Sequence, residues 1–67
     1  MTQRALAMNV KRLRTQRGLT QSELAKKATV SQAFIAQLET GAEANPKLDT
    51  LRRLAKALAV RVGELVD

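Results

Sequence analysis

The side chains best suited to chemistry in this 67-residue chain lie between Ser31 and Gln37. If this segment is a helix, its outward side chains are two amides and two methyl groups, those of Gln32, Ala33, Ala36 and Gln37. An amide can hydrogen-bond a base edge, and a methyl group can contact the thymine methyl, in a DNA major groove about 12 Å wide. The pattern therefore indicates a helix that reads DNA, although solvated glutamines on a helix surface would look the same.

The chain lacks the residues on which most catalytic and metal sites depend. It has no cysteine, histidine, tyrosine or tryptophan, and its six acidic residues are scattered along the sequence. General acid–base and nucleophilic catalysis draw on those side chains or on paired carboxylates, and zinc sites need cysteine or histidine. We therefore expect a protein that is not an enzyme and that has no metal, cofactor or small-molecule ligand.

The charge balance is strongly basic. Twelve lysine and arginine residues against six aspartate and glutamate residues give a net charge of +6. Such an excess is typical of proteins that bind nucleic acid, although an acidic protein partner would fit the same charge. Most of these basic side chains are expected only to make helix surfaces soluble, among them Lys11, Arg12, Arg17, Lys26, Lys27, Arg52, Arg53 and Lys56.

Length and hydropathy favour a single cytoplasmic domain spanning residues 1–67. A chain this short can bury only one core. It has no cysteine for disulfides, no apolar run near the ~20 residues of a membrane span, and no signal peptide in its first ten residues.

Apolar residues recur at helical spacing along almost the whole chain. They predict an all-α fold with helices over residues 3–17, 21–28, 32–39 and 47–58, and a fifth helix within residues 61–67. Cap residues support these ends: Thr2, Thr20 and Ser31 at N-termini, and Gly18 and Gly41 after C-termini. Thr20 and Glu23 have the spacing of a capping box. Residues 42–46 are expected to form a loop, with Pro46 at the first turn of the next helix.

Residues 20–39 have the organisation of a helix-turn-helix. Two short helices flank a turn at residues 28–30, with the small Ala25 where they would cross. The apolar positions of both helices are expected to share one core, and they are Leu24, Ala28, Val30, Ile35 and Leu38. Phe34 is expected to pack at the edge of that core rather than to stack on bases.

At this level of detail the chain resembles the Cro/repressor-type helix-turn-helix family, with the five-helix domain of the lambdoid phage repressors. The resemblance is carried by RLRTQRGLTQSELAKKATVSQAFIAQLETG (12–41), NPKLDTLRRLAKALAV (45–60) and GELV (63–66), which together cover nearly the whole chain. In this family the second helix of the motif enters the major groove.

The resemblance implies a role for each matching residue. Gln21 looks like the glutamine that bonds a DNA phosphate and braces the first residue of the recognition helix. Gln32 looks like that first residue, which reads a base, and Gln37 like a second reader one turn later. Ala33 looks like a position that meets thymine methyls.

Other matching residues imply positioning roles. Arg14 and Glu39 match a pair that forms a salt bridge between the first and third helices, with Arg14 also near a phosphate. Thr40 occupies a position from which phosphate is often contacted. Thr20 is likewise expected to contact a phosphate or to position the residues that do. The Arg14–Glu39 pair could equally be a weak surface ion pair.

Three residues depart from the family pattern. Thr29 stands where a left-handed glycine is usual, so we expect strain or a different turn. Glu43 lies in a loop that is often basic. Arg61 stands where a serine often caps the fifth helix, so that helix is expected to begin poorly.

Together these features predict a sequence-specific double-stranded DNA-binding transcriptional regulator, a repressor from a bacterium or phage. One short helix reads few base pairs, so a homodimer on a two-fold symmetric operator is expected. Its contact patch would be Val62, Leu65 and Val66. The alternatives are a restriction-modification controller protein, or an antitoxin-like module of the same fold that grips an acidic partner.

Overall fold

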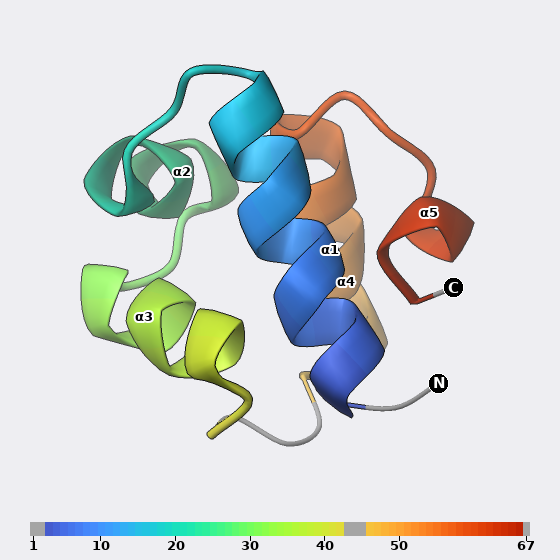
Figure 1. Cartoon of the computed structure of the whole chain (residues 1–67). Helices are drawn as coiled ribbons and strands as arrows, with labels where there is room; N and C mark the ends of the chain where they lie inside the picture. The colour runs from blue at the N-terminus through green and yellow to red at the C-terminus, as the bar shows by residue number, and fades with distance from the viewer. Residues whose placement is uncertain (1–2, 43–45, 67) are drawn as a thin grey trace.

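Five helices and no strands make up the part of the chain that the computed structural model describes, residues 3–42 and 46–66 (Figure 1). The helices are α1 (Gln3–Gln16), α2 (Gln21–Ala28), α3 (Gln32–Thr40), α4 (Leu48–Ala57) and α5 (Val62–Val66). The all-α prediction is confirmed, and each helix lies where the periodicity placed it. The predicted bounds differ by one residue at the end of α1, at the end of α3 and at both ends of α4. Pro46 was expected in the first turn of α4 but precedes the N-cap, which is Lys47.

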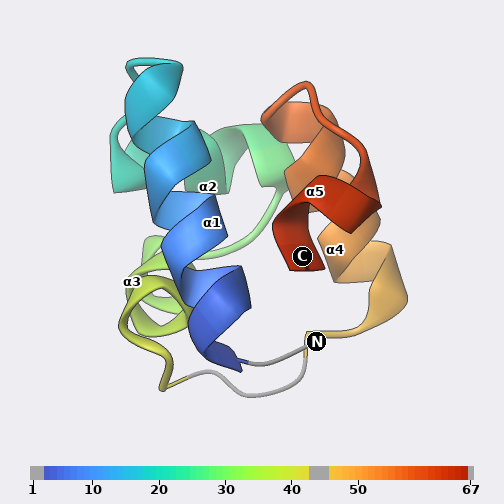
Figure 2. The ribbon, with the colours of Figure 1, turned by 45° about the vertical axis from the view of Figure 1, so that its right-hand side comes forward.

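The helices pack as a bundle in which helices far apart in the sequence also become neighbours in space. The long α1 packs against α3 on one side and α5 on the other, while α2 packs on both α3 and α4. Figure 2 shows the short α5 seated beside α1 and α4. The first and last helices therefore close the fold together, and α3 is left at one edge with a free face. None of the helices described is long and apolar enough to cross a membrane.

One apolar core joins all five helices. Its fully buried large side chains are Leu6, Val10, Leu24, Ile35, Leu38, Leu54, Leu58 and Leu65. No polar or charged residue among those described is buried as a whole, although the side chain of Glu39 is only 4% exposed. The core predicted for the helix-turn-helix is confirmed, with Ala25 buried and with Val30 and Phe34 packed at the edge. Truncating one of these leucines to alanine typically costs 2–5 kcal/mol, so the core is what holds the motif in place.

Side-chain caps start α2 and α3 as predicted. The Thr20 hydroxyl accepts from the Glu23 N–H at 3.0 Å, and the Thr20 N–H donates to the Glu23 carboxylate at 2.8 Å. The hydrogen bond from the Thr20 backbone N–H lowers the pKa of Glu23 below its usual range, and the interaction with the Thr20 side chain lowers it further. At pH values above the pKa that Glu23 has in the unfolded chain, the capping box therefore contributes its full stabilisation of α2. This contribution is lost as the pH falls through the lower pKa that Glu23 has in the folded chain. The Ser31 hydroxyl caps α3 by accepting from the Phe34 N–H at 3.0 Å.

Some expected features fall on residues outside those described: the Thr2 cap, the Glu43 side chain and the Asn45 backbone.

The first four helices all end in the same way, with a residue of positive φ followed by an N–H that donates five residues back. Those bonds run from Leu19 to Arg14, Val30 to Ala25, Ala42 to Gln37 and Val60 to Ala55, at 2.9–3.1 Å. This geometry satisfies carbonyls that a helix end leaves free. The positive φ belongs to glycine at Gly18 and Gly41, but to Thr29 (59°) and Ala59 (58°) in the other two. Thr29 therefore keeps the family's left-handed turn despite its β-branched side chain.

Replacing Thr29 by glycine is expected to raise the free energy of unfolding by about 1 kcal/mol, because glycine adopts a positive φ without steric cost. Chemical denaturation of the two proteins measures the difference. Ala33→Gly is the control, because it places glycine inside α3 and should lower stability by about 0.5–1 kcal/mol. A destabilised Thr29→Gly variant would show that the threonine side chain compensates for its backbone.

Candidate nucleic-acid interface

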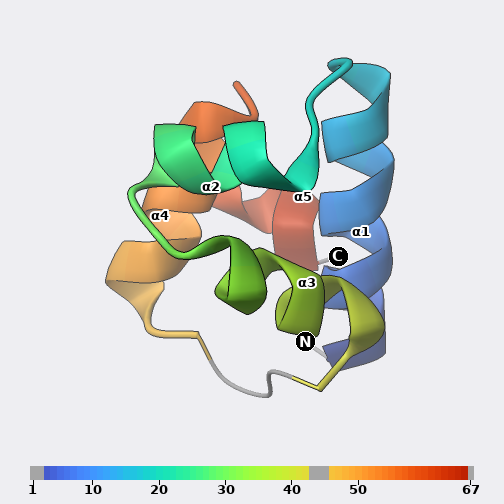
Figure 3. The same cartoon turned by 90° about the vertical axis from the view of Figure 1, so that its left-hand side faces the viewer.

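The exposed face of α3 carries amides and methyl groups and no charge. Gln32, Ala33 and Gln37 are exposed, and Ala36 is half-buried. In Figure 3, α3 lies in front of the bundle with α2 above it and α4 behind. The one charged residue of α3 is Glu39, and its side chain is only 4% exposed. A helix with this surface can approach base edges closely without bringing a carboxylate to the phosphates.

An ion pair fixes the end of α3 to α1. Arg14 Nε donates to Glu39 Oε2 at 2.6 Å, and Arg14 Nη2 donates to Glu39 Oε1 at 3.1 Å. The side chains are 15% and 4% exposed, so the pair lies mostly below the surface, and its contribution to stability stays a prediction. The hydrogen bond to Glu39 raises the pKa of the Arg14 guanidinium. Arg14 Nη1 also donates to the Leu19 carbonyl at 2.7 Å, which ties the loop before α2 into the same cluster.

Gln21, at the start of α2, completes this cluster. Its Nε2 donates to Glu39 Oε1 at 3.1 Å, so one carboxylate receives donors from α1 and from α2. The amide is thereby held with one N–H turned toward Glu39 and its other N–H available. The family resemblance implies a brace between Gln21 and Gln32, whereas the hydrogen bond observed here goes to Glu39. A contact of Gln21 with phosphate stays a prediction.

The two threonines expected near phosphates are exposed and already make local bonds. The Thr20 hydroxyl serves the cap of α2. The Thr40 hydroxyl donates to the Gln37 carbonyl at 2.9 Å and accepts weakly from the Ala42 N–H at 3.4 Å. Thr40 therefore orders the last turn of α3, and a bond to phosphate would have to displace or share this one.

The expected dimer patch needs one correction. Leu65 is fully buried in the core, because α5 packs that side chain between α1 and α4, so it cannot contribute to a surface. Val62 and Val66 are half-buried and remain at the surface. The patch on the described residues is therefore reduced to these two valines.

Two polar contacts of α5 were missed in the sequence. Asn9 Nδ2 donates to the Leu65 carbonyl at 2.9 Å, which anchors the end of α5 to α1. The Arg61 N–H donates to the Glu64 carboxylate at 3.3 Å. The second contact is half of a capping box and was readable from the spacing of Glu64, so α5 begins without a serine cap. Nothing in the sequence pattern marks Asn9.

The residues described include no group of histidine, cysteine, aspartate and glutamate that could hold a metal ion.

Comparisons with known proteins agree with this geometry. A model of the helix-turn-helix family matches residues 10–65. The immunity repressor protein of Bacillus phage phi105 is 38% identical over 61 residues, which are 91% of this chain and 42% of the repressor. The chain therefore spans less than half the length of that repressor. It also spans only 29% of the length of a similar helix-turn-helix regulator from Coxiella burnetii.

Two solved structures are similar over almost their full length. One is the biofilm regulator SinR in complex with DNA, with a TM-score of 0.89 at 31% sequence identity. The similarity covers 92% of this chain and 98% of the SinR chain. The restriction-modification controller protein C.AhdI from Aeromonas hydrophila has a TM-score of 0.89 at 28% identity and covers 94% of both chains.

Arg14 and Glu39 are expected to be energetically coupled. Removing either partner leaves a buried charge unpaired and should lower the free energy of unfolding by roughly 3–5 kcal/mol, while Arg14→Met combined with Glu39→Leu should recover part of that loss. A double-mutant cycle by denaturant unfolding measures the coupling. Additive single effects below about 0.5 kcal/mol would mean that the pair contributes no more than a surface ion pair.

Proposed function

This chain belongs to the helix-turn-helix family of transcriptional regulators, in its Cro/repressor-type branch, and we propose that it represses transcription as a homodimer bound to a two-fold symmetric operator. The observation that carries this proposal is the uncharged amide and methyl face of α3, held at the edge of the bundle by the buried Arg14–Glu39 pair. A protein of this kind would act in the cytoplasm of a bacterium, where its DNA is.

Base reading is assigned to Gln32, Ala33 and Gln37. The exposed face of α3 carries no arginine or lysine for the bidentate contact to guanine, whereas a glutamine can bond adenine with both atoms of its amide. Ala33 is exposed next to Gln32 and suits a thymine methyl. We infer that the half-site contains A·T pairs under the first turn of α3.

Phosphate contacts are assigned to Gln21, Thr20, Arg14 and Thr40. Gln21 and Thr20 lie at the N-terminus of α2, where free N–H groups and the helix dipole favour an anion. Arg14 is mostly buried, so its first role is to hold Glu39, with phosphate as a secondary partner. These contacts would fix the position of α3 on the duplex without reading sequence.

A restriction-modification controller is a second candidate within the same DNA-binding class. The similarity to C.AhdI, which covers 94% of both chains, favours it. Both candidates use the same interface, and neither involves catalysis or a cofactor. They differ in the genes that lie beside the operator.

The base-reading proposal is tested on duplexes selected from a random pool for binding to the whole chain. Gln32→Ala should weaken binding to the selected duplex by about 1–3 kcal/mol and change binding to random duplex little, because only a specific contact is lost. Gln16→Ala, an exposed glutamine of α1, is the matched control and should change neither. Equal weakening on selected and random duplex would show that Gln32 reads no base.

The dimer proposal predicts that Val66→Asp weakens binding to the full operator by about tenfold or more, because a charge would be buried between the two copies. Binding to a single half-site should stay unchanged, and circular dichroism should show the same helix content. Met8→Asp, which alters an apolar side chain 63% exposed on α1, is the control. A Val66→Asp variant that binds the full operator normally would contradict this dimer.

A further inference from the structure

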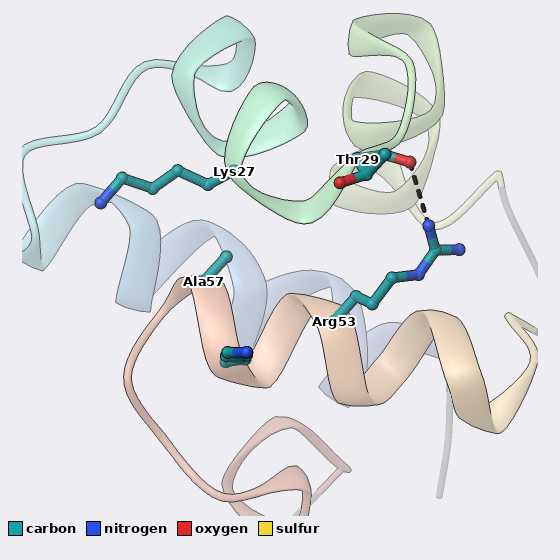
Figure 4. Close-up of a pocket in the computed structure, with 5 residues that line it drawn as sticks. Lys27, Thr29, Arg53 and Ala57 are labelled. Atoms are coloured by element: carbon teal, nitrogen blue, oxygen red, sulfur yellow. Dashed lines mark hydrogen bonds between the residues drawn. The ribbon is translucent and has the colours of Figure 1, made fainter.

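A basic hollow lies between the C-terminal end of α2 and α4, away from the exposed face of α3. We name it the α2–α4 hollow; it is open to solvent, has a volume of about 400 Å³ and is lined by Lys27, Thr29, Arg53, Lys56 and Ala57 (Figure 4). Three of these five residues carry a positive charge and none carries a negative one. The DNA-binding surface proposed above uses none of them.

The positive charge of the hollow is only partly offset within the part of the chain that the structure describes. Every carboxylate that the structure describes already has a partner: Glu23 in the cap of α2, Glu39 with Arg14, Asp49 with Arg53, and Glu64 with the Arg61 N–H. Asp49 offsets part of the Arg53 charge at 3.3 Å, but it is itself exposed and does not line the hollow. Lys27 lies near Glu23, whose carboxylate already accepts from the Thr20 N–H. Lys56 has no ion-pair partner among the described carboxylates.

Arg53 is held in place and keeps donors to spare. Its Nη1 donates to the Thr29 carbonyl at 3.1 Å, as Figure 4 shows, and its Nη2 donates to the Thr50 hydroxyl at 3.4 Å. A guanidinium has five N–H donors, and its planar fork matches a carboxylate. Because two of the five make hydrogen bonds, the Arg53 side chain is pre-organised and the remaining Nη donors can bind an anion.

The spread of the charges favours a carboxylate-bearing peptide over a lone phosphate. The three cationic side chains of the hollow come from two different helices, α2 and α4, so a segment with several carboxylates can pair with more of them than one compact anion can. The Ala57 methyl and the lysine stems offer apolar surface beside the charges.

We propose that the α2–α4 hollow docks an acidic segment of a partner protein. One carboxylate of that segment pairs with Arg53, and neighbouring carboxylates pair with Lys27 and Lys56. Because the hollow shares no residue with the α3 face, the partner binds whether or not DNA is bound. This surface does not depend on the proposed operator function, since its residues would dock the same segment on a chain that reads no DNA.

The test follows backbone amide NMR shifts of the whole chain during titration with hexaglutamate at fixed ionic strength, with hexaglutamine as the uncharged control. The amides of Lys27, Thr29, Arg53 and Lys56 should shift and saturate with hexaglutamate alone. Lys27→Gln combined with Lys56→Gln should weaken binding by about fivefold or more, since two exposed ion pairs are lost. Lys11→Gln combined with Arg17→Gln removes equal charge from α1 and the turn that follows it, and should change the affinity less than about twofold.

Three results would overturn the proposal. Equal weakening by both double variants would mean that hexaglutamate senses only net charge. Inorganic phosphate that produces the same shifts with equal affinity would reduce the hollow to a simple anion site. The hollow would be a DNA contact if the Lys27→Gln, Lys56→Gln variant lost more binding to random duplex than its control variant. Displacement of hexaglutamate by saturating duplex would lead to the same conclusion. Saturation with duplex that leaves hexaglutamate bound supports the proposal.

Discussion

The arrangement of the helix-turn-helix depends on one buried carboxylate. Glu39 receives Arg14 from α1 and Gln21 from α2, so three helices meet at a single side chain near the end of α3. A buried ion pair contributes little net stability, because desolvation of both charges offsets their attraction. Its effect here is to select one packing: a rotated or shifted α3 would leave Glu39 buried without its donors, which is costly.

This constraint also decides the charge of the recognition surface. With Glu39 turned inward, the outward face of α3 presents only amides and methyl groups, while the basic residues lie on the other helices. The remaining described carboxylates are engaged in caps or ion pairs. The net charge of +6 therefore attracts polyanions such as DNA to the whole protein. The uncharged face of α3 distinguishes one base sequence from another.

Features set by neighbouring residues could be read from the sequence, and features set by distant contacts could not. The caps at Thr20 and Ser31 and the left-handed ends at Gly18 and Gly41 follow from local chemistry. Even Thr29 was recognisable, because its position in the motif demands a positive φ. Ala59 shares that conformation, at the end of α4, without any local signal in the sequence.

Contacts between residues far apart in the chain account for what was missed. Asn9 bonds a carbonyl 56 residues away, and Arg53 bonds the Thr29 carbonyl across 24 residues. The same limitation explains Leu65, which periodicity left at the surface and which α1 covers in the fold. The Arg14–Glu39 pair spans 25 residues, and only the family pattern could indicate it.

The central claim is that α3, held by Glu39, lies in the major groove. Because the chain has no cysteine, Ala42→Cys, at an exposed residue just after α3, provides a unique thiol for an iron chelate that cleaves nearby DNA and leaves the base-reading side chains unchanged. On the selected operator, cleavage should fall in two clusters about 10 base pairs apart, one for each copy of α3. The same chelate attached through Lys11→Cys, on the outer face of α1, should cleave weakly. Stronger cleavage from position 11, or cleavage from position 42 with no preferred sites, would contradict the claim.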